Sequence, residues 1–298
     1  MKHSAVRAAV ALLAALPWPV IHGLGWVVGR VAARCNSKTG LIADINLRLC
    51  FPRMPEAERR ELWRASLVEN ARTLLEMPKM WRGDPTRWAA RVQPASAASA
   101  ELPRRALARG KGLLVIAPHL GNWEVGILYL PALAPVTALY RPPREAALAE
   151  VMLKGRSAAG GTLVPTSVSG IKSLYQALKR GEIVCILPDQ QPKGGEGGGN
   201  RFAPFFGHQA LTITLLSRLA RRSGAPVLSL FYERLPGRRG FREHWLEPPA
   251  EIHSPDEATS VAAMNQAIEE CIALCPRQYQ WSYKRFATRP PGVISLYP

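Results

Sequence analysis

The middle of the chain alternates short apolar runs with segments of helical spacing. Apolar, partly β-branched residues fill 112–117, 135–140 and 182–187, and proline or glycine bounds each run. Uninterrupted runs of this length are typical of strands buried on both faces of a sheet. Helical patterns occupy the intervening segments 144–158 and 169–180. We therefore expect an α/β fold with a mostly parallel central sheet and helices on both faces.

The same reasoning predicts elements on either side of this region. The expected elements are an amphipathic helix from Pro55 to about Met77, a short helix within 95–110, a short strand at 162–165, a helix at 210–222, a strand at 226–232, a candidate edge strand at 242–246 and a last long helix at 256–274. Glu76 lies beside the apolar stripe of the first helix, where either an arginine partner, a substrate or solvent could meet it.

The N-terminal segment needs its own explanation, because residues 8–29 form a run of 22 without Asp, Glu, Lys or Arg. A cleaved signal peptide, a spanning helix and an interfacial or hairpin-like anchor are the three alternatives. Pro17 and Pro19 break a spanning helix, and Arg30 and Arg34 follow directly. We expect an uncleaved, membrane-associating helical segment over 1–34 on the cytoplasmic side of a membrane, followed by one domain over 35–298.

Candidate chemistry lies where the run 112–117 ends. Pro118 stops the strand and delivers His119 to its carboxyl edge, where open α/β sheets bind their ligands. Asn122 is a helix-capping residue, and Glu124 follows in the first helical turn. A neutral imidazole can take a proton from a hydroxyl group, and a carboxylate on its other nitrogen would hold the tautomer. A turn-capping histidine beside a favourably placed helical glutamate is the alternative interpretation.

A second strand ends in the same manner, because 182–187 is followed by Pro188, Asp189 and Gln190. If both strands are parallel, Asp189 faces the cleft that contains His119. We expect Asp189 to pair with Arg141 or Arg156; contact with a sugar of a bound substrate and a simple turn role are the alternatives.

Composition limits the class of protein. A net charge of +17, with the basic residues dispersed, favours an anionic membrane, an acidic protein or nucleic acid as partner. The five cysteines form no CxxC pair and are expected to be reduced thiols. GxSxG, HExxH and GxxxxGK[ST] are absent, which argues against a serine hydrolase, a zinc hydrolase and a phosphate loop. Phe205 and Phe206 fit either a packed core or the wall of an acyl pocket.

Several motifs together resemble the late acyltransferases of lipid A biosynthesis, the lauroyl/myristoyl group of the lysophospholipid-type acyltransferases. The matching motifs are NLRLCFP from Asn46, GKGLLVIAPHLGNWEVG around His119, LYRPPR from Leu139, LPDQQP from Leu187, FAPFFGHQALT from Phe202 and PRQYQWSYKRF from Pro276. This resemblance implies an α/β acyltransferase fold with an HxxxxE dyad, matched by His119 and Glu124, and no cofactor or metal. It implies acyl carrier protein as donor, and a hydroxyl of a lipid A precursor as acceptor.

From these motifs we expect a general-base mechanism without a covalent intermediate. His119 would deprotonate the acceptor hydroxyl while Glu124 orients its ring, and the backbone amides of Gly121 or Asn122, or Arg141, would hold the oxyanion. The expected substrate-binding residues are Asn122, Arg141, Arg144, Arg156, Asp189, Gln190, Phe205 and Phe206. A phospholipid, an ornithine lipid or another glycolipid as acceptor is one alternative. A basic membrane-surface or nucleic-acid-binding protein without catalysis is the other; we expect no nucleic acid as partner.

Overall fold

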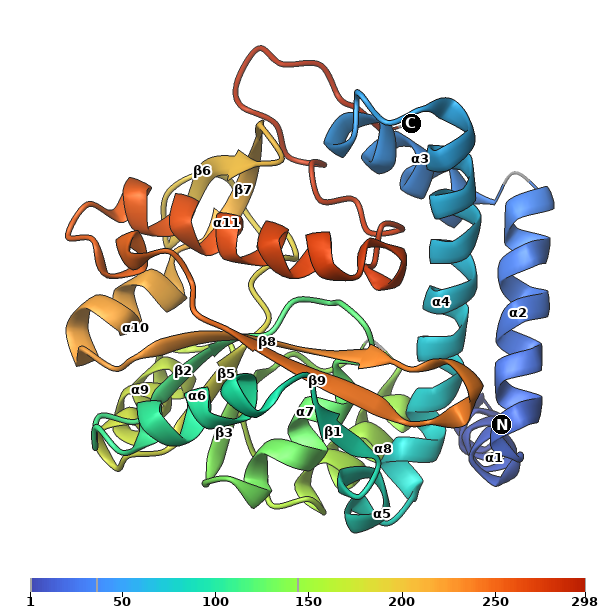
Figure 1. The fold of residues 1–298 in the computed structure, drawn as a ribbon, viewed down its shortest axis with the longest axis horizontal. Helices are drawn as coiled ribbons and strands as arrows, with labels where there is room; N and C mark the ends of the chain where they lie inside the picture. Colours follow the sequence, from blue (N-terminus) through green and yellow to red (C-terminus); the bar gives the residue numbers. More distant parts are fainter. Residues whose placement is uncertain (1, 36, 144, 298) are drawn as a thin grey trace.

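A computed structural model describes residues 2–35, 37–143 and 145–297, and it centres on one mixed sheet (Figure 1). Within these residues the sheet has seven strands in the order β1-β9-β8-β2-β5-β3-β4. Its strands are β1 (Val92–Pro94), β2 (Leu113–Ile116), β3 (Val136–Tyr140), β4 (Thr162–Pro165), β5 (Ile183–Ile186), β8 (Val227–Arg234) and β9 (Phe241–Leu246). The five strands from β8 to β4 run parallel, while β9 is antiparallel to β8. The predicted mostly parallel sheet is therefore confirmed.

Helices cover both faces of this sheet. They are α1 (Lys2–Ala15), α2 (Trp18–Arg34), α3 (Lys38–Cys50), α4 (Glu56–Arg82), α5 (Pro85–Ala89), α6 (Ala97–Leu107), α7 (Glu124–Tyr129), α8 (Ala146–Ser157), α9 (Val168–Lys179), α10 (Leu215–Ser223) and α11 (Glu257–Leu274), with 3-10 turns at Leu130–Ala132, Pro236–Arg238, Ala250–His253 and Pro276–Gln278. The two faces explain why β2 is apolar throughout. Leu114 packs with the core under α9, α10 and α11, whereas Leu113 packs with the core under α6 and α7.

The register of β2 and β5 determines where their ends lie. Ile116 is paired with Ile186 in this parallel pair, so the two strands finish side by side. His119 and Asp189 each follow three residues after these paired positions. Both side chains consequently reach the same carboxyl edge of the sheet, as the sequence predicts.

The segment after the glycine-rich loop differs from the prediction. Residues 210–213 belong to a hairpin of β6 (Asn200–Phe205) and β7 (His208–Ile213), and the helix begins only at Leu215. The hairpin turns at Phe206 and Gly207, whose φ angles are 47° and 75°. Positive φ at both central residues matches the twist of a two-residue hairpin. The strand predicted at 242–246 is present, but it is not the edge, because β1 pairs outside it.

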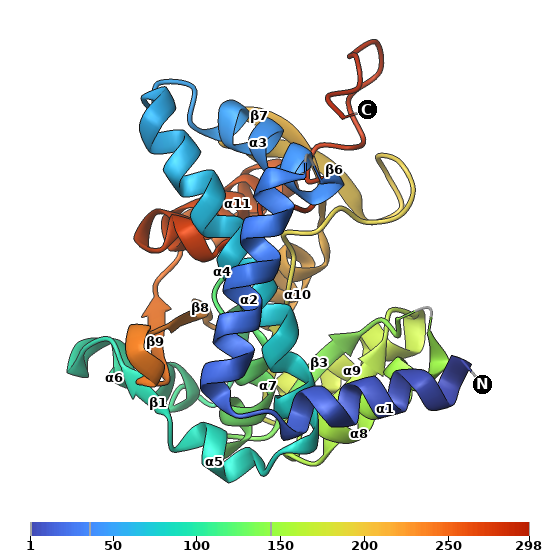
Figure 2. The ribbon, with the colours of Figure 1, turned by 90° about the vertical axis from the view of Figure 1, so that its right-hand side faces the viewer.

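The N-terminal segment forms two helices that meet at an angle (Figure 2). In the described residues no helix is by itself long and apolar enough to cross a membrane; α1 and α2 pass that test only as a pair bent by 116°. Gly25 and Gly29 of α2 lie against Arg72 and Val68 of α4, and a Cβ at Gly29 would stand 2.4 Å from the Val68 Cα. These glycines therefore let α2 lie directly on α4. The boundary at residue 34 stays a prediction.

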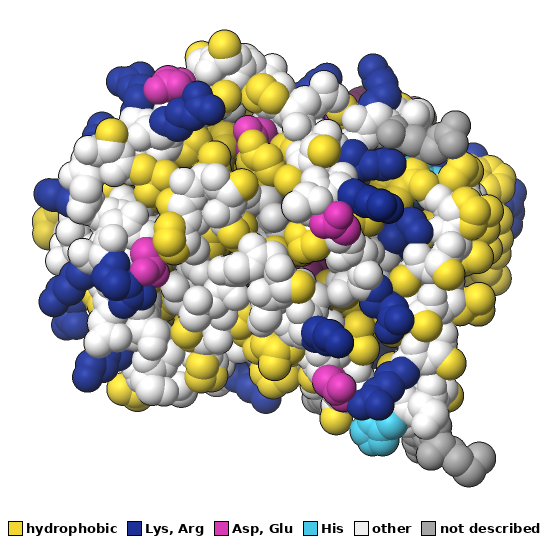
Figure 3. All heavy atoms as spheres, turned by 90° about the horizontal axis from the view of Figure 1, so that it is seen from below, with side chains coloured by type: hydrophobic (Ala, Val, Ile, Leu, Met, Phe, Trp, Pro, Cys, Tyr) yellow, Lys and Arg dark blue, Asp and Glu magenta, His cyan; other side chains and the backbone are white. Residues whose placement is uncertain are grey.

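The opposite side of α2 carries an apolar stripe. Val20, Leu24, Val27, Val28 and Val31 follow helical spacing, and each is between 39% and 51% exposed. Viewed from below, hydrophobic side chains gather at the right-hand edge, where α1 and α2 lie, with Lys and Arg side chains beside them (Figure 3). An exposed apolar stripe of this kind marks a site of contact with an apolar partner.

Candidate functional site

His119 is held by Asp189 at the carboxyl edge of the sheet. Its Nδ1 lies 2.8 Å from Asp189 Oδ1, and its backbone N–H donates to Asp189 Oδ2 at 2.9 Å. Asp189 is 2% exposed. Burial alone would raise the pKa of this carboxyl group, but the charge and hydrogen bonds of His119 outweigh burial and leave the pKa below its usual value. An ionised Asp189 therefore accepts the Nδ1 proton, which makes Nε2 the nitrogen of the neutral ring that can accept a proton.

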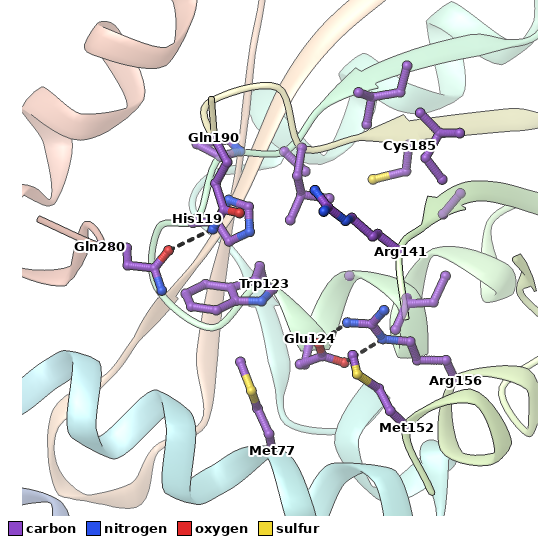
Figure 4. Close-up of a pocket in the computed structure, with 18 of the residues that line it drawn as sticks. Met77, His119, Trp123, Glu124, Arg141, Met152, Arg156, Cys185, Gln190 and Gln280 are labelled. Atoms are coloured by element: carbon purple, nitrogen blue, oxygen red, sulfur yellow. Dashed lines mark hydrogen bonds and ion pairs between the residues drawn. The ribbon is translucent and has the colours of Figure 1, made fainter. Parts of the chain in front are cut away.

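Glu124 has other partners, which corrects the expected pairing within the dyad. Both of its oxygens are engaged by Arg156, and Trp81 Nε1 donates to Oε2 at 2.9 Å. Glu124 is the first residue of α7, and its side chain extends toward α8, not toward the His119 ring (Figure 4). Burial would lower the pKa of Arg156, but the adjacent carboxylate raises it above its usual value. The pair is thus a buried ion pair in the cavity wall, and Arg156 pairs with Glu124 where pairing with Asp189 was expected.

A largely apolar cavity of about 710 Å³ lies beside His119. It is lined by side chains from the first, fourth, seventh and eighth helices and from the ends of β3 and β5; examples are Leu13, Met77, Ile127, Met152 and Cys185. Arg141 projects into this space from the end of β3, and the Trp123 ring lies edge-on to the His119 ring at 4.9 Å (Figure 4). A volume within roughly 300–1,000 Å³ and few polar groups are typical of a site for an organic ligand.

The loop that carries His119 is fixed by backbone hydrogen bonds. Gly121 N donates to Gln278 O at 3.1 Å, and Asn122 N donates to Tyr232 O at 2.9 Å. Gly121 has a φ of 64°, and a Cβ there would stand 1.9 Å from Tyr232 O, so this position requires glycine. Because both amides already have acceptors, they are not free to hold an oxyanion. Of the three donors expected from the sequence, Arg141 remains.

Behind this loop lies a buried ionic network that sequence reasoning only partly anticipated. Glu76 is fully buried and accepts hydrogen bonds from Arg234 Nε at 2.6 Å and Asn122 Nδ2 at 2.6 Å, with His22 Nε2 at 2.7 Å. Thr73 of the same helix donates to Gly121 O at 3.1 Å. Burial would raise the pKa of Glu76, but Arg234 and His22 lower it below its usual value. Of the open interpretations of Glu76, the arginine partner is correct.

The network also changes the role of Asn122. Its side chain is 0% exposed and is occupied by Glu76 and by the Glu124 backbone N–H, so it is a structural group where substrate contact was expected. Arg234 was missed. The available signal is its position two residues after the apolar strand predicted at 226–232, where an unpaired buried charge would be costly.

The remaining expected residues separate into three groups. Gln190 lines the His119 cavity and donates to Gln280 Oε1 at 3.0 Å, so Gln280 joins the site from the C-terminal motif. Phe205 and Phe206 do not line this cavity; they pack in the core, with Phe206 against Trp281, and the acyl-pocket expectation for them is wrong. Arg144 lies outside the described residues.

The described residues 2–35, 37–143 and 145–297 contain no group of three or more His, Cys, Asp or Glu side chains that could hold a metal ion. The side chains at the site offer acid–base and electrostatic chemistry: an Asp-held imidazole, a cationic Arg141 and a buried ion pair around an apolar cavity.

Comparison with known proteins gives consistent matches along the chain. Residues 2–288 match the family model described as bacterial lipid A biosynthesis acyltransferase. The chain is 32% identical to the lipid A biosynthesis lauroyltransferase of Escherichia coli (strain K12), with 96% of this chain and 91% of that protein covered. It is 31% identical to the palmitoleoyltransferase of the same strain, with 95% and 90% covered. The myristoyltransferase of that strain is 27% identical, with 91% and 82% covered.

Proposed function

This chain belongs to the family of bacterial lipid A biosynthesis acyltransferases, and we propose that it moves a fatty acyl chain from acyl carrier protein to a hydroxyl of a lipid A precursor. The observation that carries the proposal is the position of His119, which is oriented by a buried carboxylate at the mouth of a large apolar cavity. An O-acyltransferase needs these two parts: a base for the hydroxyl and a dry space for the chain.

In the proposed reaction, His119 Nε2 takes the proton of the acceptor hydroxyl as its oxygen attacks the thioester carbonyl carbon. The carbon–sulfur bond then breaks, and the leaving thiolate takes the proton back from the imidazolium. Asp189 balances the imidazolium charge and keeps Nδ1 protonated. General-base catalysis of this kind contributes roughly 10²- to 10⁴-fold, and positioning of donor and acceptor supplies much of the rest.

No covalent intermediate is needed, and the thiol nearest to the site is poorly suited to form one. Cys185 lines the cavity, but burial raises the pKa of its thiol to about 12. The thiol therefore stays protonated near neutral pH, and the thiolate is the nucleophilic form.

Arg141 is our proposed oxyanion donor. The guanidinium group makes no hydrogen bond or ion pair with the residues that the structure describes, and it extends into the cavity (Figure 4). Glu124 and Arg156 have a different part in this scheme. Their buried ion pair holds α7 against α8, and thereby shapes the cavity wall beside His119.

Membrane contact is proposed through α1 and α2. The exposed stripe on α2 would enter the interface, and Arg30 and Arg34 at its end would meet anionic headgroups, each contributing about 1 kcal/mol. Val10 and Leu13 of α1 line the His119 cavity, so the cavity extends to the helices that we place at the membrane. An acceptor that resides in the cytoplasmic leaflet would reach His119 from this side.

The test is a reconstituted transfer reaction. Purified enzyme, acyl carrier protein loaded with a C12 chain and a lipid A precursor should give a product heavier by one acyl group in mass spectrometry. His119→Ala should lower turnover by at least the lower end of the general-base range, about 100-fold. The control is His253→Ala, because His253 lies exposed in a surface turn and does not line the cavity. Acylation of a phospholipid in place of the lipid A precursor, or a His119→Ala enzyme that keeps a tenth of its turnover, would contradict the proposal.

A further inference from the structure

A second cavity of about 480 Å³ adjoins the His119 cavity. Leu139, Thr166 and Ile213 line both cavities, so the two spaces meet at these three side chains. Leu139 belongs to β3 and Thr166 follows β4, which places the second cavity at the carboxyl edge of the parallel strands as well. A ligand whose reacting group lies at His119 can therefore extend into this second cavity.

Arginines from one helix line the second cavity. Arg218, Arg221 and Arg222 stand at positions i, i+3 and i+4 of α10, and all three belong to the lining. Arg218 Nε donates to Glu257 Oε2 at 2.9 Å, and Arg221 Nη1 donates to Pro255 O at 2.9 Å. Arg222 makes no hydrogen bond or ion pair with any residue that the structure describes. With Glu257 counted, the lining has three cations and one anion, a net charge of +2 (3 minus 1).

The other residues of the described lining add no further carboxylate. Gly198 and Gly199 contribute backbone at φ angles of 58° and 107°, and Tyr175 contributes its ring. All three guanidinium groups thus have donors left for a ligand, because Arg218 uses only Nε, Arg221 uses only Nη1, and Arg222 uses none within the described residues. Guanidinium groups are suited to phosphate, to which they donate paired hydrogen bonds.

We propose that this second cavity binds the phosphate of a phosphopantetheine thioester, the chemical form in which the donor presents its acyl chain. The inference rests on the proposed acyl transfer and adds the path of the donor. The acyl chain would occupy the apolar cavity, the thioester would lie at His119, and the pantetheine arm would pass Leu139, Thr166 and Ile213 to reach the arginines.

The alternative occupant is a phosphate of the acceptor lipid, and the shape of the molecule argues against it. The helices α9 and α10 lie at one end of the longest axis, and α1 and α2 lie at the other end (Figure 1). A membrane-borne acceptor would approach from the side of α1 and α2. The arginines that line the cavity stand on α10, at the opposite end of this axis, which suits a donor that arrives from solution.

Binding of two non-transferable probes tests the proposal without turnover. The probes are C12 amides of phosphopantetheine and of pantetheine, which differ only in the phosphate. Wild-type enzyme should bind the phosphorylated probe about tenfold or more tightly, as charge-assisted hydrogen bonds allow. Arg222→Glu should remove this preference and leave affinity for the phosphate-free probe unchanged. Arg105→Glu on α6 is the matched control, because Arg105 is exposed and lines neither cavity.

The outcomes separate this proposal from the transfer function itself. Equal affinity of the wild-type enzyme for both probes, or an Arg222→Glu enzyme that keeps the preference, would overturn the phosphate site even if transfer occurs. If Arg222→Glu raises the KM for the acceptor and leaves the KM for the donor unchanged, the cavity binds the acceptor and the proposal is wrong. Absence of transfer by wild-type enzyme, with the preference intact, would count against the proposed function only.

A second comparison identifies the source of the phosphopantetheine. C12-coenzyme A and C12-acyl carrier protein share this group, so Arg222→Glu should raise the KM of both. A larger rise in KM for the C12-acyl carrier protein than for C12-coenzyme A, with a difference that shrinks at higher salt concentration, would show that the acidic surface of the carrier protein also contacts α10. Arg218→Gln provides an independent variant, and it should also lower the affinity for the phosphorylated probe.

Discussion

Replacement of Asp189 by asparagine should reverse the tautomer of His119. In the native site the two carboxylate oxygens accept two hydrogen bonds from His119, one from Nδ1–H and one from the backbone N–H. Asparagine has a single acceptor oxygen at the same place. The backbone N–H can only donate and therefore claims that oxygen, which turns the amide NH₂ toward Nδ1. Nδ1 must then become the acceptor, and the proton moves to Nε2, the nitrogen that should receive the hydroxyl proton.

The expected loss in kcat is on the order of 10³- to 10⁴-fold, the scale seen when an aspartate that orients a catalytic histidine is changed to asparagine. At about 1.4 kcal/mol per factor of ten, this corresponds to roughly 4–5.5 kcal/mol of transition-state stabilisation. The assay measures kcat with saturating donor and acceptor, and ¹⁵N NMR of the imidazole reports the tautomer. Asp256→Asn is the control, because Asp256 caps α11 on the surface. An Asp189→Asn enzyme within tenfold of the wild-type kcat would refute this reasoning.

Three further predictions follow from the same geometry. Glu124→Gln should lower kcat less than Asp189→Asn and leave the His119 tautomer native in the ¹⁵N spectrum; a reversed tautomer would restore Glu124 as the partner of the ring. Glu76→Ala should lower the free energy of unfolding in urea by roughly 1.5–3 kcal/mol, because it removes the buried acceptor of Arg234 Nε and leaves Glu69 as the remaining ion-pair partner of Arg234. The pKa of Glu76 in the folded protein lies below its usual value, so the stability that its ionised form contributes is complete above the usual pKa and is lost as the pH falls through the folded pKa. The wild-type enzyme should therefore lose more stability than Glu76→Gln in that acidic range. Parallel curves of unfolding free energy against pH for the two enzymes would contradict this assignment. Val27→Glu, in the exposed stripe of α2, should reduce sedimentation with anionic vesicles at unchanged melting temperature; undiminished binding would exclude this face.

The sequence by itself determined the parts of this protein that local patterns encode. The apolar runs located β2, β3 and β5, since a strand covered on both faces needs apolar side chains at every position. Pro118 and Pro188 marked the ends of two of these strands and so placed His119 and Asp189 at one edge. The motif order was enough to identify the family, which the match over residues 2–288 confirms.

Tertiary structure alone decided which carboxylate serves His119. Glu124 is five residues away in the chain, yet its position at the start of α7 directs it to Arg156. Asp189 is 70 residues away and reaches Nδ1 because β2 and β5 are neighbours in register. Strand order depends on how helices pack over the whole sheet, and no local pattern states it. The same reason applies to Arg234, whose partner Glu76 lies 158 residues earlier. A buried charge in the sequence predicts that a partner exists, but only the packed fold brings that partner within hydrogen-bonding distance.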